Sequence, residues 1–256
     1  MKTISILIPA YNEEESISYL YERVLNVVAN LRNYQFELLF VNDGSSEQTL
    51  SIIKQLRTKD HRISYVDLSR NFGKEIAMIA GLDHAKGDAV VILDADLQDP
   101  PELIPELVSY WEEGYDDVYA KRRSRKGESW LKKTTSATFY KILKKISQVP
   151  IQEDTGDFRL LDRRCVEAIK QLRESQRYTK GMFSWVGYHK KEVLFDRDPR
   201  VSGKTKWNYR KLVDLAIEGV NVYHCASKAI FINGDYCLFH SIYIYALHHL
   251  KNSCLR

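Results

Sequence analysis

Short apolar runs alternate with amphipathic stretches over roughly the first 120 residues of the chain. The first run, Ile4 to Ile8, is rich in β-branched residues and ends at Pro9, which is typical of a buried strand. Asn12 follows, with Glu15 three residues later, and this pair predicts the start of a capped helix. Apolar residues then recur at helical spacing as far as Leu31. The pattern therefore predicts a strand, a loop and a helix in this order.

The same alternation recurs further along the chain. Additional strands are expected at 36–41, 63–68, 89–93 and 117–120, and additional helices at 47–56, 74–84 and 103–111. Strands that alternate with helices in this way are typical of a mainly parallel α/β sheet with helices on both faces. Ligands of such sheets bind at the carboxyl ends of the strands. The loops after the strands are therefore where functional residues are expected.

The composition indicates one globular domain. The chain has 256 residues, 44% of them hydrophobic and 28% charged, with a formal net charge of +4. These values exclude disordered, collagenous and disulfide-rich proteins. The four cysteines form no CxxC pair and nothing before Thr3 resembles a secretory leader, which favours a reducing cytoplasmic setting. The sequence has no uninterrupted run of about 18 apolar residues, so composition by itself indicates a soluble protein.

The segment 121–147 departs from this near-neutral balance. Its first 26 residues hold ten basic side chains and the single acid Glu128, with apolar residues at helical spacing. The pattern predicts a basic amphipathic helix, which suits an anionic membrane surface. A solvated surface helix is the alternative, and no nucleic acid is expected because no recognition motif accompanies the charge. The residues expected to face the acceptor or the membrane are Arg122, Arg123, Lys132 and Lys133.

Acids and amides gather in the loops after three of the predicted strands. Asn12 and Glu13 follow the first strand, Asp43 the second, and Asp94 and Asp96 the fourth. Each has a local explanation on its own, as a helix cap or a turn residue. Together at one edge of a sheet, the carboxylates would repel one another unless a cation or a hydrogen-bonding ligand were present.

Asp94 and Asp96 are the most specific of these residues. A divalent cation held by one or two carboxylates can complete its coordination shell with diphosphate oxygens. The sequence contains neither GxGxxG after the first strand nor GxxxxGK[ST]. It therefore lacks the glycine-rich loops with which dinucleotide-binding and P-loop proteins hold phosphates. The phosphates of a nucleotide would have to be held by a metal ion and by side chains.

Seven motifs occur in order along the chain: IPAYNEE (8–14), VNDGSSEQT (41–49), RNFGKEIAMIAGLDHAKGD (70–88), DADLQDPPE (94–102), GDFRLLDRR (156–164), KGMFSWVG (180–187) and RVSGKTKWN (200–208). Through them, about residues 4–219 resemble the family 2 glycosyltransferases of the GT-A fold. The resemblance is close to the polyisoprenyl-phosphate type, the bactoprenol glucosyltransferases in particular. It implies a GT-A type α/β fold with a nucleotide-binding sheet.

The resemblance also implies roles for individual residues. Those implied around the uracil and ribose of a UDP-sugar are Pro9, Tyr11, Glu13 and Asp43. Asp94 and Asp96 would hold Mg²⁺ or Mn²⁺ on the diphosphate, with Gln98 near the donor sugar. Catalytic roles are implied for Asp157, Asp96, Arg200 and Lys204, with Arg159 bordering the reaction centre. From the residues alone, the less favoured alternatives are that Asp157 caps a turn after Gly156 and that Lys204 is a solvated loop lysine.

The implied reaction is metal-dependent transfer of a hexose, with glucose preferred, from a UDP-sugar to undecaprenyl or another polyisoprenyl phosphate. Inversion at the sugar and a role in cell-surface glycan modification are expected. Asp157 is expected to position the acceptor or stabilise the cationic sugar as much as to remove a proton, because a phosphate monoester, with a second pKa near about 6, attacks as a dianion. The alternatives are another donor such as GDP-mannose or a UDP-N-acetylhexosamine, a sugar-nucleotide pyrophosphorylase, and an inactive membrane-binding remnant.

The resemblance ends near residue 220. Residues 1–220 are expected to form the catalytic domain, and 221–256 a tail rich in Cys, His and Tyr where relatives of this type continue into two membrane-spanning helices. A frameshift or a truncated reading frame is the expected origin of that tail. The resemblance implies a place at the cytoplasmic face of the inner membrane, with this chain peripheral or soluble, and homo-oligomerisation is a further expectation.

Overall fold

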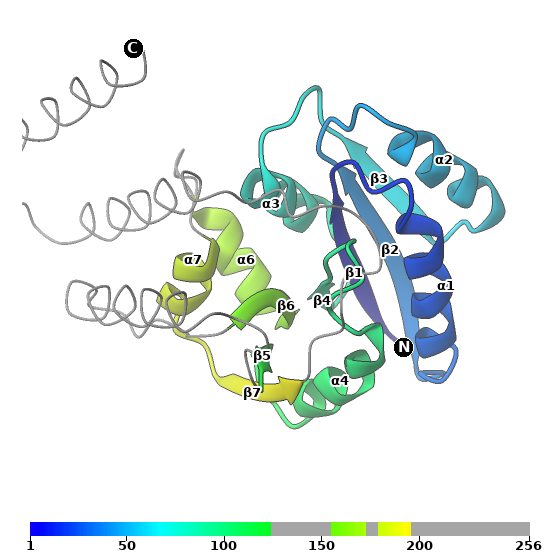
Figure 1. Ribbon diagram of the computed structural model, residues 1–256. Helices are drawn as coiled ribbons and strands as arrows, with labels where there is room; N and C mark the ends of the chain where they lie inside the picture. The colour runs from blue at the N-terminus through cyan, green and yellow to red at the C-terminus, as the bar shows by residue number, and fades with distance from the viewer. Residues whose placement is uncertain (124–154, 173–178, 196–256) are drawn as a thin grey trace, which may run out of the picture.

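The computed structural model describes residues 1–123, 155–172 and 179–195. Within them seven strands form one sheet in the order β3-β2-β1-β4-β6-β5-β7 (Figure 1). The strands are β1 (Lys2–Ala10), β2 (Tyr34–Asn42), β3 (Ile63–Asp67), β4 (Ala89–Ile92), β5 (Asp117–Arg122), β6 (Thr155–Asp162) and β7 (Lys190–Phe195). The helices are α1 (Ile17–Val28), α2 (Thr49–Lys59), α3 (Lys74–His84), the 3₁₀ turn η1 (Pro101–Leu103), α4 (Ile104–Glu112), α6 (Arg163–Gln171) and α7 (Thr179–Trp185).

The strands of this sheet are mostly parallel. β1 pairs in parallel with β2 and β4, and β2 pairs in parallel with β3. β6 runs antiparallel to both of its neighbours, β4 and β5, whereas β7 is parallel to β5. In the described part of the chain, β6 is therefore the one strand that runs against the others. The predicted mainly parallel α/β sheet is confirmed, but the sequence pattern did not predict β6 or β7.

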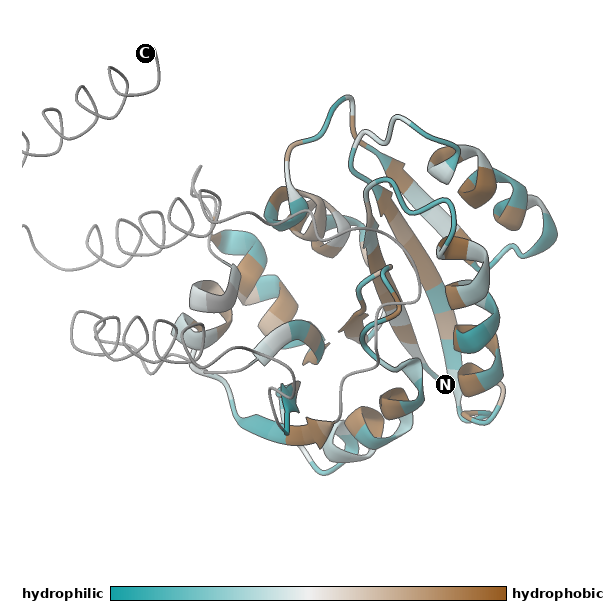
Figure 2. Cartoon of the chain, in the orientation of Figure 1, coloured by the Kyte–Doolittle hydropathy of each residue, from teal (hydrophilic) through white to brown (hydrophobic). Residues whose placement is uncertain are grey.

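Alternating side chains of the strands divide the core into two layers. In β1, Ile4, Ile6 and Ile8 pack on one face with α1, α2 and α4, and Leu7 packs on the other with α3, α6 and α7. Figure 2 shows the apolar colour along the strands and on the helix sides turned towards them. β4 is buried over its whole length, as expected of a central strand in a sheet covered on both faces. The helices on both faces agree with the sequence pattern.

The first strand is longer than predicted and includes Pro9. A proline inside a strand removes one donor from the ladder. Leu7 O accepts from Leu93 N on the β4 side, and Pro9 faces the same side two residues later, beyond the last β1–β4 pair at Leu7 and Ile92. The missing N–H of Pro9 therefore costs no ladder hydrogen bond. Pairing with β4 ends at Leu7, whereas pairing with β2 continues through Pro9 and Ala10.

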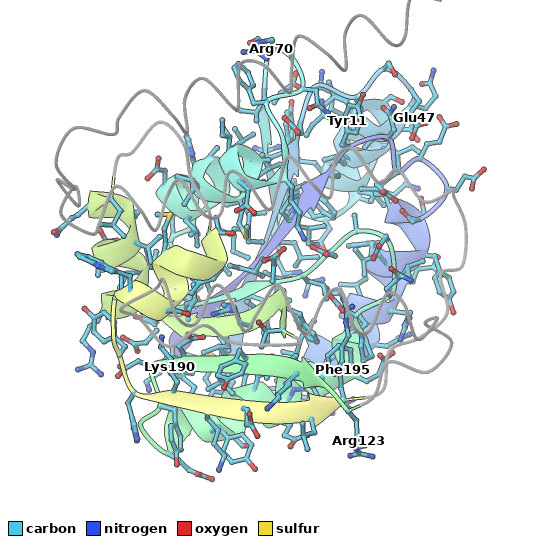
Figure 3. All side chains as sticks on the ribbon, turned by 60° about the vertical axis from the view of Figure 1, so that its left-hand side comes forward. Tyr11, Glu47, Arg70, Arg123, Lys190 and Phe195 are labelled. Carbon is cyan, nitrogen blue, oxygen red and sulfur yellow. The ribbon has the colours of Figure 1, made fainter. Side chains whose placement is uncertain are left out.

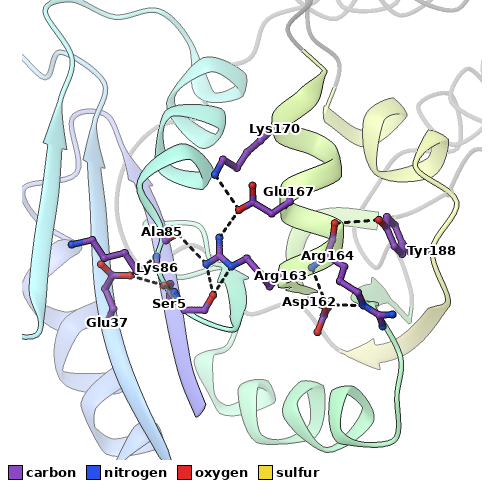
Figure 4. Close-up of polar contacts among 11 residues, drawn as sticks. Ser5, Glu37, Ala85, Lys86, Asp162, Arg163, Arg164, Glu167, Lys170 and Tyr188 are labelled. Carbon is purple, nitrogen blue, oxygen red and sulfur yellow. Dashed lines mark hydrogen bonds and ion pairs between the residues drawn. The ribbon is translucent and has the colours of Figure 1, made fainter. Parts of the chain in front are cut away.

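The start of α6 is held by hydrogen bonds at the amino end of β4, opposite the carboxyl ends of β1 and β4 (Figure 4). Arg163 donates from Nε to Gly87 O at 2.8 Å and from Nη2 to Ala85 O at 3.0 Å, in the loop that follows α3. Asp162 caps α6 by accepting from Arg164 N at 2.9 Å. Since Asp162 is the last residue of β6, this cap sets the direction in which α6 leaves the sheet.

Several predictions fall outside the described residues. They concern the predicted basic helix 121–147 from residue 124 onwards, with Lys132 and Lys133, the loop that carries Arg200 and Lys204, and the tail 221–256. The start of that predicted helix is wrong, because Lys121 and Arg122 are the last residues of β5. Within the described ranges, the structure has no helix that is long and apolar enough to cross a membrane.

Candidate active site

The loops after β1 and β2 are tied together by reciprocal hydrogen bonds. Asn12 N donates to Ser45 Oγ at 3.0 Å, and Ser46 N donates to Asn12 Oδ1 at 2.9 Å. Glu14 extends the pairing, since its N–H donates to Glu47 Oε1 and its Oε2 accepts from Gln48 N, each at 2.9 Å. Figure 3 shows Tyr11, Glu47 and Arg70 gathered in this part of the molecule. Two loops distant in sequence therefore form one polar rim at the carboxyl edge of the sheet.

Asn12 does not cap a helix, so this part of the sequence-based prediction is wrong. Its φ is +54°, in the left-handed region that Asn tolerates better than most residues. α1 begins only at Ile17, after a turn in which Ser16 N donates to Glu13 O at 3.1 Å. Ser45 and Ser46 likewise bond to Asn12 instead of capping α2, which starts at Thr49. The left-handed turn directs the amide of Asn12 to the neighbouring loop.

Asp43 holds the loop before α3. Its carboxylate is buried, with Oδ1 accepting from Phe72 N at 2.8 Å and Oδ2 from Gly73 N at 2.9 Å. Gly44 next to it has a φ of +62°, and a Cβ there would lie 2.3 Å from the carbonyl carbon of Arg70. Glycine is therefore required at 44 by both backbone conformation and contact. The loops after β2 and β3 touch at this point.

The loop after β4 carries the predicted pair of carboxylates. Asp94 and Asp96 are half-buried, and Asp96 Oδ1 accepts from Gln98 N at 3.2 Å. Leu97, directly after Asp96, has a φ of +61°, and its side chain is buried. A non-glycine residue in this conformation costs of order 1–3 kcal/mol and is concentrated at functional sites. The strained turn is maintained by the burial of Leu97 in the core.

Asp94 and Asp157 lie level with each other on neighbouring strands. β4 and β6 are antiparallel with Ile92 opposite Arg159, so two further residues along this register bring Asp94 opposite Asp157. Two carboxylates in such a cross-strand position repel each other. The structure places a lysine ammonium between them. Lys74 Nζ lies 2.6 Å from Asp94 Oδ1 and 2.6 Å from Asp157 Oδ2.

Lys74 is the first residue of α3, so its ammonium reaches the ends of β4 and β6 from a third element. Burial acts to lower the pKa of Lys74, but the charges of Asp157 and Asp94 outweigh it and raise that pKa. The side chain is nevertheless 40% exposed, so solvent reaches the cluster. Lys74 therefore carries a positive charge at the centre of the candidate site.

Glu75 connects this cluster to α7. Its Oε2 accepts from Thr179 N at 3.0 Å and also from the Thr179 hydroxyl. Burial, and after it the charge of Asp157, raises the pKa of Glu75. The start of α3 thus presents one side chain to Asp94 and Asp157 and the next to α7.

The candidate site lies at the carboxyl ends of the parallel strands, with the carboxylates of Asp94 and Asp96 in the loop after β4. A profile of glycosyl transferase family 2 matches residues 5–170. The chain belongs to this family. The glycosyltransferase is 53% identical over 217 residues to the uncharacterized glycosyltransferase sll0501 of Synechocystis sp., a match that covers 85% of this chain and 68% of that protein. It is 46% identical over 217 residues to the prophage bactoprenol glucosyl transferase homolog of Escherichia coli, covering 85% and 71%.

Solved structures of glycosyltransferases share the fold. Glucosyl-3-phosphoglycerate synthase from Mycobacterium tuberculosis, in complex with Mn²⁺, UDP-glucose and phosphoglyceric acid, is 18% identical to this chain with a TM-score of 0.56. The match covers 90% of this chain and 82% of that chain. The GT-A type fold expected from the sequence is confirmed, and the protein is a glycosyltransferase.

Asp94 and Asp96 are suited to a divalent cation that also binds a diphosphate. Within the described ranges, no group of three or more His, Cys, Asp or Glu side chains could hold a metal ion. Two carboxylates are enough for Mg²⁺ when phosphate oxygens and water supply the other ligands. The ammonium of Lys74 against Asp94 shows that this edge already accommodates a cation. The two carboxylates therefore fit a divalent cation.

The predicted donor residues all lie at this edge. Pro9 is buried at the end of β1, and Tyr11 and Glu13 follow in the rim, where Glu13 Oε2 accepts from Ser16 Oγ at 2.8 Å. Both carboxylate oxygens of Asp43 accept hydrogen bonds from backbone N–H groups of the neighbouring loop. Gln98 is half-buried in the turn after Asp96.

Arg159 is buried in the core, on the same strand as Asp157. Its guanidinium pairs with Asp117 at 3.1 Å, and both side chains are fully buried. The guanidinium carbon also lies 3.9 Å from the ring centroid of Phe183. Burial raises the pKa of Asp117, although Arg159 and Lys190 act against it. Arg159 on β6 therefore connects Asp117 on β5 with Phe183 on α7.

Arg122 lies beside the segment that carries Asp157. A Cβ built on Gly156 would lie 3.9 Å from Arg122 Nη2. Arg122 Nε is buried and has no hydrogen-bond partner in the part of the chain that the structure describes. Arg123, directly after β5, is exposed, and its N–H donates to Phe195 O at 2.9 Å. Figure 3 shows Arg123 and Phe195 together, away from Tyr11.

Lys74, Glu75 and Thr179 are the site residues that the sequence analysis missed. Lys74 and Glu75 stand in the motif RNFGKE, directly after a glycine at the start of a predicted helix. Two charged residues at the start of a helix, next to a sheet edge that is rich in carboxylates, could have indicated that Lys74 and Glu75 belong to the candidate site. Thr179 gave none, because α7 was not predicted.

Proposed function

We propose that the protein transfers glucose from UDP-glucose to the phosphate of a polyprenyl phosphate such as undecaprenyl phosphate, with inversion at the sugar and with a divalent cation. The observation that carries the proposal is the cluster of Asp94, Lys74 and Asp157 at the carboxyl edge of the sheet. The bactoprenol glucosyl transferase homolog of Escherichia coli, at 46% identity, supports glucose and a polyprenyl acceptor. The M. tuberculosis enzyme, described with Mn²⁺ and UDP-glucose, supports the donor and the ion.

The uridine of the donor binds in the rim formed by the loops after β1 and β2. Pro9, Tyr11, Glu13 and Asp43 line this pocket in the proposal. The reciprocal bonds between Asn12 and Ser46 and between Glu14 and Gln48 hold the rim in one arrangement before the donor arrives. A site that is already ordered loses less conformational entropy on binding.

Asp94 and Asp96 would hold Mg²⁺ or Mn²⁺, and Gln98 would lie next to the donor sugar. When bound, the cation neutralises the negative charge that develops on the departing UDP. Arg200 and Lys204 supply further positive charge to the phosphates in this proposal. Preplaced charge of this kind lowers the barrier because it requires no reorganisation during the reaction.

In the reaction, the bond between C1 of the sugar and the β-phosphate oxygen of UDP breaks, and a bond forms between C1 and an oxygen of the acceptor phosphate. UDP leaves with the bonding electron pair. The acceptor phosphate has a second pKa of about 6, so at neutral pH it attacks as a dianion and needs no base. Asp157, 9% exposed and paired with Lys74, faces the sugar as a fixed negative charge that stabilises its cationic character.

The acceptor approaches from the side of Gly156. Arg122, which is half-buried and lies beside Gly156, is available to the acceptor phosphate in this proposal. Arg123, Lys132 and Lys133 continue this basic surface towards the membrane in the proposal. Lys and Arg near an anionic surface contribute about 1 kcal/mol each to membrane binding. The reaction then takes place at the cytoplasmic face of the membrane, where both the nucleotide sugar and the lipid phosphate are available.

The donor is tested by incubating the full chain with Mn²⁺, a polyprenyl phosphate and one labelled donor at a time: UDP-glucose, UDP-galactose, UDP-N-acetylglucosamine and GDP-mannose. Label from UDP-glucose should enter the lipid phase fastest. Faster transfer from another donor would replace glucose in the proposal, and transfer from none would overturn it.

Asp157→Asn tests the role of the fixed charge. Turnover with saturating donor and acceptor should fall by roughly a hundredfold or more, because one preplaced electrostatic group of this kind contributes on that scale. Glu106→Gln, which changes an exposed carboxylate on α4, is the matched control and should keep normal turnover. Near-normal turnover of Asp157→Asn would refute the catalytic role of Asp157.

A further inference from the structure

Lys74 lies where a divalent cation would have to bind. Its ammonium is 2.6 Å from Asp94 Oδ1, the carboxylate that begins the metal-binding motif, and 2.6 Å from Asp157 Oδ2 on the neighbouring strand. The three side chains come from the start of α3, the end of β4 and the start of β6. The ammonium is thus a built-in cation between two carboxylates that would otherwise repel each other.

A metal ion and the ammonium cannot both bind Asp94 closely without repulsion. An ion that enters alone must displace Lys74 from Asp94 or accept a positive charge next to it. An ion that enters with a diphosphate does not meet this obstacle, because phosphate oxygens offer Lys74 new acceptors. Lys74 is 40% exposed and carries a flexible side chain, so its ammonium can move from a carboxylate to a phosphate.

We propose that Lys74 is a positioning residue that blocks tight binding of a divalent cation to Asp94 until the nucleotide diphosphate arrives, and that it remains paired with Asp157 afterwards. This inference rests on the proposed function, since it requires that Asp94 binds the ion. It makes binding of ion and donor cooperative: each strengthens the other by the same factor. It also keeps the carboxylate of Asp157 in a fixed place when the donor site is empty.

A purely structural ion pair is the competing explanation. In that case Lys74 would join α3 to β4 and β6, and its removal would lower stability while the strengthening of Mn²⁺ binding by UDP stayed the same. A cation that competes with the ion for Asp94 predicts instead that removal of Lys74 makes this strengthening by UDP smaller.

The test measures Mn²⁺ binding to the full chain by electron paramagnetic resonance, with and without UDP. The variants are Lys74→Met and Lys74→Arg, with Lys86→Met as the matched control, because Lys86 is exposed beyond the opposite end of α3. Without UDP, Lys74→Met should bind Mn²⁺ roughly tenfold more tightly than the native chain, as expected for loss of one neighbouring positive charge. The strengthening caused by UDP should shrink correspondingly. Lys74→Arg and Lys86→Met should behave like the native chain.

The outcomes separate this inference from the proposed function. If the native chain binds Mn²⁺ in the presence of UDP but Lys74→Met does not bind it more tightly in the absence of UDP, the inference is overturned and the metal site stands. If the native chain binds no Mn²⁺ even with UDP, both fail. Thermal unfolding of each variant shows whether it is folded, and Lys74→Arg, which keeps the charge, must retain the native Mn²⁺ affinity for the inference to hold.

Discussion

Glu75 at the start of α3 accepts hydrogen bonds from both the backbone N–H and the side-chain hydroxyl of Thr179 at the start of α7. Thr179 is fully buried. The residue before Glu75 is Lys74, whose ammonium lies between the carboxylates of Asp94 and Asp157. The position of the central lysine therefore depends on how firmly α3 is held against α7.

Thr179→Val should remove the hydroxyl donor and leave the backbone donor in place. A buried carboxylate oxygen then loses one of its partners, and the free energy of unfolding should fall by about 1 to 3 kcal/mol. Urea unfolding measures this change. Thr58→Val on the exposed side of α2, where the hydroxyl bonds to Gln55 O, is the control and should change stability little. Equal effects of the two variants would contradict the role given to Thr179.

Gly44→Ala should disturb the contact between the loops after β2 and β3. The new Cβ would lie 2.3 Å from the backbone of Arg70, and φ at this position is +62°. Conformation and contact together should cost more than about 2 kcal/mol, since the conformation alone costs roughly 1–2 kcal/mol. Gly114→Ala is the matched control, because Gly114 has a φ of +99° with nothing within 4 Å of an added Cβ. If urea unfolding shows that Gly114→Ala is as destabilising as Gly44→Ala, the close contact with the backbone of Arg70 adds nothing to the loss of stability, and the prediction is contradicted.

Arg159→Met should be strongly destabilising, by about 3 to 5 kcal/mol, because it leaves Asp117 buried without its partner. The double variant Arg159→Met with Asp117→Leu should be more stable than Arg159→Met alone, since it leaves no buried charge. Denaturant unfolding of the native chain, of Arg159→Met, of Asp117→Leu and of the double variant gives the coupling between the two sites. The exposed pair of Arg23 and Glu102 is the control, and Arg23→Met should cost far less. A double variant less stable than Arg159→Met would contradict the argument.

Asp60 predicts a pH dependence of stability. The hydrogen-bonded guanidinium of Arg62 lowers the pKa of Asp60 to about 2 from its ordinary value of 3.8. A lowered pKa in the folded state stabilises the protein above the unfolded-state pKa, and this stabilisation is lost as the pH falls towards 2. Asp60→Asn should therefore be less stable than the native chain at pH 7, by about 1 kcal/mol once solvent screening is allowed for. Urea unfolding at pH 7, 4 and 3 should show this difference shrinking, and a difference independent of pH would refute it.

The sequence predicted the sheet edge well, because its strands are continuous apolar runs and its loops carry unusual carboxylates. Pro9, Asp43, Asp94 and Asp96 could be placed at that edge from the order of the strands alone. Leu97 could not be foreseen, since its left-handed backbone is maintained by burial in the tertiary core and not by any turn residue.

The remaining errors come from long-range pairing. β6 runs against its neighbours, and only its register with β4 brings Asp157 level with Asp94. Because the sequence pattern gave no strand there, it could not show that Lys74 lies between them. Asn12 was assigned to a cap from local spacing, whereas the structure pairs it with Ser45 and Ser46, thirty or more residues away.

The most direct test of the account is transfer of radiolabelled glucose from UDP-glucose to undecaprenyl phosphate by the full chain in detergent, with phase separation of product and donor. The account predicts label in the lipid phase, lost when EDTA removes the divalent cation and lost in Asp94→Asn, but retained in Glu106→Gln. Label that stays in the aqueous phase with Mn²⁺ present, or transfer that continues in EDTA, would contradict it.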